Sequence, residues 1–86
     1  MKSRANDRFW RSYRVLPPEI RTLARKTYRL WCRQPDHPSL HFKKVATDTW
    51  SARIGPHYRV LAAEENGILI WFWIGSHDEY ERLLRK

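Results

Sequence analysis

The apolar residues of this chain change their period once, near residue 40, and this switch constrains the fold more than any other feature. Before it, apolar side chains recur every three or four residues, as one face of an α-helix requires. After it they alternate, as they do in a half-buried β-strand. Because the helical part comes first and the strands follow, the order predicts an α+β fold in which N-terminal helices pack on a sheet.

Two helices are expected before the switch. The first covers residues 7–16, and Pro17 and Pro18 end it because proline cannot continue a helix. The same prolines suit the first turn of a second helix, which Pro35 stops. The two helices are predicted to form a hairpin with a shared apolar side. One face of the second helix carries a basic stripe made of Arg21, Arg25, Arg29 and Arg33.

Alternation after the switch predicts a twisted antiparallel sheet of three to four strands. The expected strands are 42–45, 49–54, 58–63 and 68–74. Asn66-Gly67 joins the last two, since this pair is the strongest short signal for a hairpin. A short helix or turn over 78–84 is expected to close the chain, with Leu83 and Leu84 docking back.

One face of the sheet is expected to pack on the helices and the other to carry function. Simple alternation puts Arg53 and Arg59 on that second face, together with Leu69, Trp71 and Trp73. A small protein that exposes an apolar and basic surface usually has a partner there. An acidic or amphipathic segment of another protein is the partner that such a face would fit.

Charge and size narrow the function classes. Seventeen Lys and Arg against nine Asp and Glu give a net charge of +8, which attracts polyanions, although solubility alone is the alternative reading. With 86 residues the chain is expected to be one domain, 1–86. No apolar run is long enough for a membrane span, and no signal peptide is evident. A lone Cys32 argues against a disulfide or a cysteine zinc site, so a cytoplasmic setting is expected.

Five segments together resemble a known family. They are 16–20 (LPPEI), 40–44 (LHFKK), 50–55 (WSARIG), 58–61 (YRVL) and 74–80 (IGSHDEY). In this order and spacing they resemble the RelE/ParE superfamily, the toxins of bacterial type II toxin–antitoxin systems, over essentially the whole chain. The resemblance implies a microbial-RNase-like fold and a cognate antitoxin that wraps the toxin. RNA cleavage by RelE-like members uses no metal. The small size of the chain leaves no room for a buried cofactor, and no membrane partner is expected.

Members of the superfamily differ in their targets. RelE-like toxins cut mRNA in the ribosomal A site, whereas ParE-like toxins inhibit DNA gyrase and lack the RNase residues. The first activity would make the ribosome and mRNA the partners of this chain, and the second would make gyrase its partner. A basic RNA- or protein-binding module without toxicity is a third possibility.

RNA cleavage without a metal needs a base for the 2′-hydroxyl, cations for the phosphate and an acid for the leaving oxygen. The resemblance implies phosphate stabilisation by Arg59, and Arg53 shares its face. His77, two residues after a glycine, matches a position where relatives carry Arg or His, and histidine can act as acid or base. Tyr80 is a candidate for base stacking or proton donation. The candidate RNA-binding residues are Lys43, Lys44, Arg21, Arg25 and Arg29.

Each of these residues also has a purely structural interpretation. Arg53 and Arg59 could be solvated strand residues, His77 could cap the last helix, and Tyr80 could simply dock it. Ser76 stands where relatives often have a basic residue, and the tyrosine is closer to the glycine than in many nucleases. These departures keep the gyrase reading open.

Overall fold

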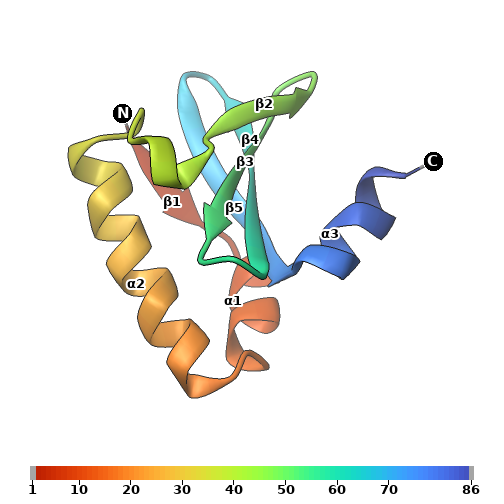
Figure 1. Cartoon of the computed structure of the whole chain (residues 1–86). Coiled ribbons are helices and arrows are strands. Elements are labelled where there is room, and N and C mark those ends of the chain that lie inside the picture. The colour runs from red at the N-terminus through yellow and green to blue at the C-terminus, as the bar shows by residue number, and fades with distance from the viewer. Residues whose placement is uncertain (1, 86) are drawn as a thin grey trace.

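The computed structural model describes residues 2–85, which form a five-stranded sheet flanked by helices (Figure 1). The elements are β1 (Ser3–Ala5), α1 (Asp7–Arg14), α2 (Pro18–Arg33), the short 3-10 helix η1 (Pro38–Leu40), β2 (Lys43–Ala46), β3 (Thr49–Ile54), β4 (Tyr58–Glu65), β5 (Ile68–Ser76) and α3 (His77–Leu84). The strand order is β1-β5-β4-β3-β2. The predicted α+β class is confirmed, and α2 and α3 lie on opposite sides of the sheet.

The predicted number of strands and the purely antiparallel sheet are wrong because of β1. This strand pairs in parallel with β5, whereas the other neighbours are antiparallel. β1 has only three residues, so it is too short to show an alternating pattern in the sequence. It covers one edge of β5, which therefore lies inside the sheet, as its apolar character on both faces predicts.

Both helices begin where the sequence predicts, but α1 ends at Arg14 rather than at residue 16, and the helices pack differently from a closed hairpin. Asn6 caps α1 by accepting a hydrogen bond from the Phe9 N–H at 3.0 Å, and α2 starts at Pro18. α1 packs mainly on β5. The Ile74 N–H of β5 donates a hydrogen bond to Ser12 Oγ of α1 at 3.1 Å. α2 packs on β3 instead. The apolar sides of the helices therefore line an open cavity rather than closing on each other.

A β-bulge in β5 changes which residues face the helices. The register passes from Leu61 opposite Trp73 to Ala62 opposite Trp71, so Phe72 is an extra residue on β5. Leu69 and Trp71 therefore belong to the helix-side core, and only Trp73 stays on the second face. The prediction that all three share the second face is wrong, because simple alternation assumes an uninterrupted ladder.

The tight turns and the helix-side core agree with the sequence. Asn66 and Gly67 both have positive φ, 53° and 77°, as the two-residue hairpin predicted between the last strands requires. Strand residues on the helix side join Trp31 in the core, and they include Ala52, Ile54, Val60 and Ala62. Within residues 2–85, no helix has both the length and the apolar character needed to cross a membrane.

Candidate functional site

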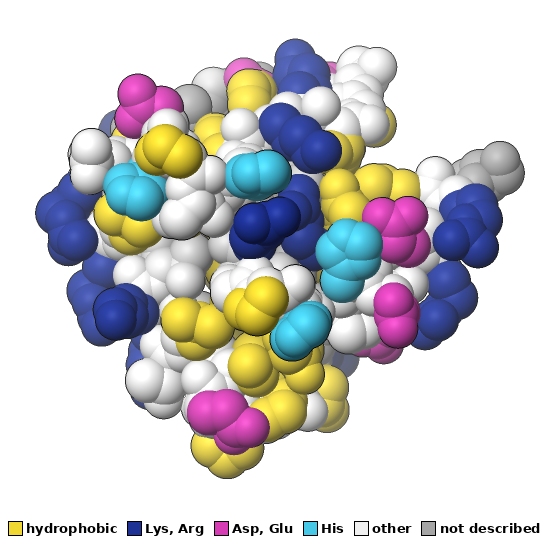
Figure 2. Space-filling model, in the orientation of Figure 1, with side chains coloured by type: hydrophobic (Ala, Val, Ile, Leu, Met, Phe, Trp, Pro, Cys, Tyr) yellow, Lys and Arg dark blue, Asp and Glu magenta, His cyan; other side chains and the backbone are white. Residues whose placement is uncertain are grey.

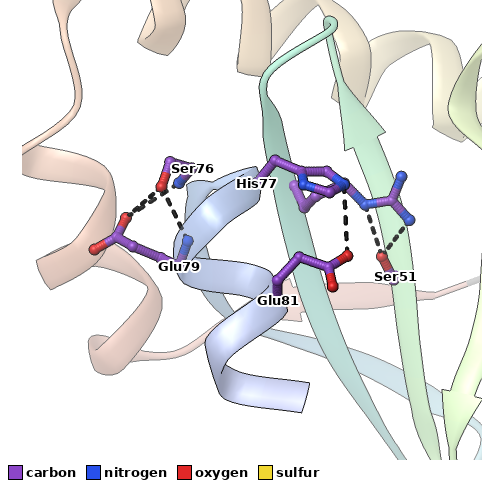
Figure 3. A network of polar contacts seen from close by, with 6 residues as sticks. Ser51, Ser76, His77, Glu79 and Glu81 are labelled. Carbon is purple, nitrogen blue, oxygen red and sulfur yellow. Dashed lines mark hydrogen bonds and ion pairs between the residues drawn. The ribbon is translucent and has the colours of Figure 1, made fainter. Parts of the chain in front are cut away.

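Arg59 is a buried guanidinium on the second face of the sheet. It lies on β4 with only 5% of its surface exposed. Its Nε and Nη2 both donate to Ser51 Oγ on β3, at 3.2 and 2.7 Å (Figure 3), and its guanidinium carbon lies 4.9 Å from the centre of the Tyr80 ring. No ion pair of Arg59 occurs among the described residues. Buried charges are normally paired, so Arg59 lacks the anionic partner that a buried cation usually has.

Arg53 is placed directly beside Arg59. The two arginines are opposite each other in the ladder between β3 and β4, and Arg53 is exposed. Like charges at directly opposed positions of a sheet repel each other, which is a local cost for the fold. An anion that binds between two guanidinium groups removes this cost and accepts forked hydrogen bonds from both.

The N-terminus of α3 carries His77 and Tyr80 to the same place. Ser76 forms a capping box with Glu79, in which Ser76 Oγ accepts from the Glu79 N–H at 3.2 Å and the Ser76 N–H donates to Glu79 Oε1 at 3.1 Å (Figure 3). The His77 N–H donates to the carbonyl of His57 at 2.8 Å, which anchors the helix to the turn before β4. The His77 and Tyr80 rings lie 5.9 Å apart.

Burial differs along α3. Tyr80 is its buried residue, packed over Arg59. Leu83 and Leu84 are 40% and 41% exposed, so the prediction that they dock back on the sheet is wrong. The helix leaves the sheet after its first turns, and the His77 side chain stays half-exposed beside Glu81, with Nε2 3.7 Å from Glu81 Oε2. Docking of α3 therefore depends on its cap and on Tyr80.

We expect Ser76→Ala to loosen α3 without unfolding the sheet. The substitution removes the acceptor for the Glu79 N–H, and loss of such a cap costs about 0.5–2 kcal/mol. Amide hydrogen exchange should increase within His77–Leu84 and stay unchanged in β4. Ser76→Asp, which restores a capping acceptor, should recover the protection. Equal protection in the alanine variant and the original chain would contradict the role of the cap.

The two candidate RNA-binding lysines are separated by the sheet. Lys43 is opposite Ser51, the hydrogen-bond partner of Arg59, and so belongs to the second face. Lys44 is opposite Trp50, and its Nζ lies 5.6 Å from the centre of that indole ring. Neighbouring residues of a strand point to opposite faces. Only Lys43 therefore lies on the face of the arginine cluster, which consists of Arg53 and Arg59.

The basic stripe of α2 is not brought together with the arginine cluster. Arg21 donates to the Leu16 carbonyl at 2.6 Å, and Arg25 donates to the Tyr13 hydroxyl at 2.6 Å. Arg25 and Arg29 line the cavity between the helices and the sheet, on the side of the sheet away from Arg59. Figure 2 shows Lys and Arg side chains beside histidines near the middle of the molecule and also along its outer edge. RNA contacts by this stripe stay a prediction.

Sequence reasoning gave no role beside Arg59 to two residues of the second face, Ser51 and Trp73, although it placed Trp73 on that face. Ser51, which receives both hydrogen bonds from Arg59, alternates in phase with Arg53, and that phase was the available signal. Trp73 lies across Gly75, where an added Cβ would be 2.4 Å from Trp73 Cζ2. Gly75 is itself opposite Arg59, so the indole extends toward the arginine cluster. Within residues 2–85, no group of three or more His, Cys, Asp or Glu could hold a metal ion.

A family model for the ParE-like toxin domain matches residues 18–82, from the start of α2 into α3. The chain belongs to the ParE-like toxin domain family. The resemblance to RelE/ParE toxins of toxin–antitoxin systems is thereby confirmed. A search of curated proteins finds no match to this chain.

Solved structures agree with the fold of this ParE-like toxin domain. The RelB-RelE antitoxin-toxin complex of Methanococcus jannaschii matches with a TM-score of 0.71 and 13% identity, over 92% of this chain and 95% of that one. YafQ of Escherichia coli matches with 0.72 and 8%, over 92% and 96%. The RelBE2 toxin-antitoxin complex of Mycobacterium tuberculosis matches with 0.69 and 21%, over 88% and 90%. At such identities the likeness concerns the fold.

Proposed function

We propose that this toxin is a metal-independent endoribonuclease that cleaves mRNA on the ribosome. The observation that carries the proposal is the buried guanidinium of Arg59, which has no carboxylate partner among the described residues and lies opposite a second arginine. A pair of cations held ready for an anion is what a phosphate in the transition state requires. The resemblance of the motifs to RelE-like toxins supports mRNA as the source of that phosphate.

The residues around Arg59 can divide the chemistry. Arg59 and Arg53 offset the charge that builds on the scissile phosphate when the 2′-hydroxyl attacks it. His77, at the rim of the cluster, exchanges a proton with the reacting oxygens, and Glu81 beside it holds the ring in place. Tyr80 covers Arg59, so the phosphate meets exposed Arg53 first and reaches Arg59 as Tyr80 moves aside to stack on a base.

The partners follow from this function. A cognate antitoxin would neutralise the toxin, and the ribosome would present the mRNA; both would be met in the cytoplasm. The net charge of +8 favours encounter with ribosomal RNA.

The direct test is primer extension on an mRNA held in purified ribosomes, with and without the toxin. New 5′ ends within the A-site codon, formed in the presence of a chelator, would support the proposal. Intact mRNA at toxin concentrations that stop growth would rule it out. Free mRNA without ribosomes is the control for contaminating nucleases.

Inhibition of DNA gyrase is the second candidate function. Two observations favour it: Ser76, where relatives often have a basic residue, is used as a helix cap, and Tyr80 covers Arg59. A supercoiling assay with purified gyrase separates the candidates. Loss of supercoiling with intact ribosome-bound mRNA would favour gyrase, and normal supercoiling together with A-site cleavage would favour the nuclease.

Lys43 and Lys44 form a matched pair for testing the face that binds RNA. We expect Lys43→Ala to lower the rate of ribosome-dependent cleavage about tenfold, because Lys43 shares the face of Arg59 and a lost contact to a charged group costs about 1.5 kcal/mol. Lys44→Ala should change the rate less than about twofold, since Lys44 packs on Trp50. The same loss in both variants would mean that only overall charge matters.

A further inference from the structure

Two aromatic residues at the bulge of β5 are not used by the helix-side core. Phe72 and Trp73 are both half-buried, and neither is part of that core or of the half-buried residues that pack against it. Trp73 is opposite Leu61, and Phe72 lines a shallow groove together with Ile70 and Ala63. The bulge therefore gives the second face two consecutive aromatic side chains.

The shallow groove crosses the sheet on the second face and has a volume of about 530 Å³. Its floor follows a row of paired residues, in which Ala63 of β4 is opposite both Ile70 of β5 and Thr49 of β3. Ala63 alternates in phase with Arg59 along β4, so both lie on the same face. Because Ala63 and Thr49 are small, the groove stays open above them.

Two exposed arginines line this groove. Arg4 of β1 is opposite Ile70, and Arg8 of α1 holds its guanidinium carbon 5.2 Å from the centre of the Phe72 ring. Within residues 2–85, neither arginine forms an ion pair. Glu65 is the only acidic residue among the described residues that line the groove. The groove is therefore positively charged and has an aromatic ring beside its cations.

The second face connects the shallow groove with the arginine cluster. The Trp73 ring lies across Gly75, and Gly75 is opposite Arg59. Ala63, in the groove, is four residues from Arg59 along β4, a distance of about 13 Å. About four stacked nucleotides cover this distance, at roughly 3.4 Å each. Cations therefore lie at both ends of this path, and Trp73 and Phe72 belong to the strand that runs between them.

We propose that the shallow groove binds the single-stranded RNA that flanks the nucleotide held at the arginine cluster. Bases stack on Trp73 and Phe72, and phosphates meet Arg4 and Arg8. Aromatic platforms combined with cations are the usual construction of a surface for single-stranded nucleic acid. An acidic peptide would use only the cations. The inference rests on the proposed nuclease function for the source of the RNA.

The first test is the binding of a fluorescein-labelled 2′-O-methyl octauridine to the full-length toxin without ribosomes. This probe has no free 2′-hydroxyl, so the toxin cannot cut it by attack of that group. Fluorescence anisotropy should show saturable binding with a Kd below about 100 µM at about 50 mM salt. Absence of saturable binding under these conditions would overturn the proposal.

Indole N–H signals of the 15N-tryptophan-labelled toxin locate the bound probe. Trp73→Phe and Trp10→Phe assign the two signals of interest. The Trp73 signal should move as the probe is added. The Trp10 signal should stay still, because that ring is 43% exposed but lines the cavity on the helix side of the sheet. Equal movement of both signals would mean unspecific stacking on exposed rings and would overturn the proposal.

Matched variants of Phe72 test the stacking. Phe72→Leu keeps an apolar side chain without a ring and should weaken binding of the octauridine about five- to tenfold. Phe72→Tyr keeps the ring and should bind within about twofold of the original chain. Thermal unfolding shows whether each variant is folded at the assay temperature. Full binding by a folded leucine variant would overturn the role of the ring.

The salt dependence of binding tests the phosphate contacts. Arg8→Ala should reduce the slope of log K against log salt concentration by about 0.7, the value for one phosphate contact on a single strand. Arg14→Ala removes the same charge from the last turn of α1 and should change the slope by less than half as much. The same change in both variants, or displacement of the probe by octaglutamate as effective as by unlabelled octauridine, would overturn the proposal.

Primer extension on ribosomes separates this inference from the proposed function. A toxin that cuts in the A site but binds the octauridine independently of Phe72 and Arg8 would lose the shallow groove as an RNA site and remain a nuclease. A toxin that binds the octauridine through these residues but leaves ribosome-bound mRNA intact would keep the RNA site and lose the proposed nuclease function.

Discussion

Arg59→Ala is expected to lower ribosome-dependent mRNA cleavage about a hundredfold to a thousandfold. The guanidinium is held by two hydrogen bonds to Ser51, so it stays oriented when Tyr80 moves aside for the substrate. Removing one preorganised donor from a catalytic site typically costs this much in rate. The measurement is primer extension at saturating toxin, with rates taken from the fraction of mRNA cleaved over time.

Controls must separate chemistry from folding, because Arg59 is buried and the alanine leaves Ser51 without its donors. Thermal unfolding should show that the variant is folded at the assay temperature. Arg59→Lys keeps the charge but lacks the planar fork, so it should recover only part of the rate. Arg14→Ala removes the same charge at an exposed position in the last turn of α1 and should cleave normally. A folded Arg59→Ala variant with full activity would leave Arg59 a structural role.

Trp31→Ala is expected to destabilise the fold by about 3–5 kcal/mol. Trp31 is 2% exposed and is the point where α2 meets the sheet, since its ring packs edge-on against both Phe42 and Trp71. Small domains have a total stability of about 5–15 kcal/mol, so the loss would be a large share of it. Urea unfolding followed by circular dichroism should show a much lower midpoint with a similar slope.

Trp10→Ala is the matched control for this change. Trp10 is 43% exposed on α1, and its ring packs edge-on against its helix neighbours Phe9 and Tyr13. Its removal should cost less than about 1.5 kcal/mol. A loss from Trp10→Ala as large as that from Trp31→Ala would contradict the position of the core between α2 and the sheet.

Much of the secondary structure could be predicted from short-range patterns. The strand over Thr49–Ile54 has the predicted bounds, and the Asn66-Gly67 hairpin lies where predicted. The reason is local: alternation, proline sterics and positive φ depend on residues only a few positions apart. The resemblance of five ordered segments likewise indicated the toxin family before any coordinates, and the family match agrees.

The errors occur where distant segments meet. The bulge at Phe72 turns Leu69 and Trp71 to the helix side, and no pattern within β5 itself predicts it. A three-residue β1 is a strand only because β5 offers it an unpaired edge. Leu83 and Leu84 remain exposed because α3 leaves the sheet after Tyr80. Each outcome depends on the register or direction of an element relative to another.

The candidate site divides in the same way. The resemblance to RelE/ParE toxins, together with the chemistry of the side chains, identified Arg53, Arg59, His77 and Tyr80 as candidates. Only the tertiary structure buries Arg59 under Tyr80, joins it to Ser51 and separates Lys43 from Lys44. The burial of a side chain, its hydrogen-bond partners and the sheet face on which it lies depend on contacts between segments that are far apart in the sequence. They are therefore determined by the packing of the whole domain rather than by any local pattern.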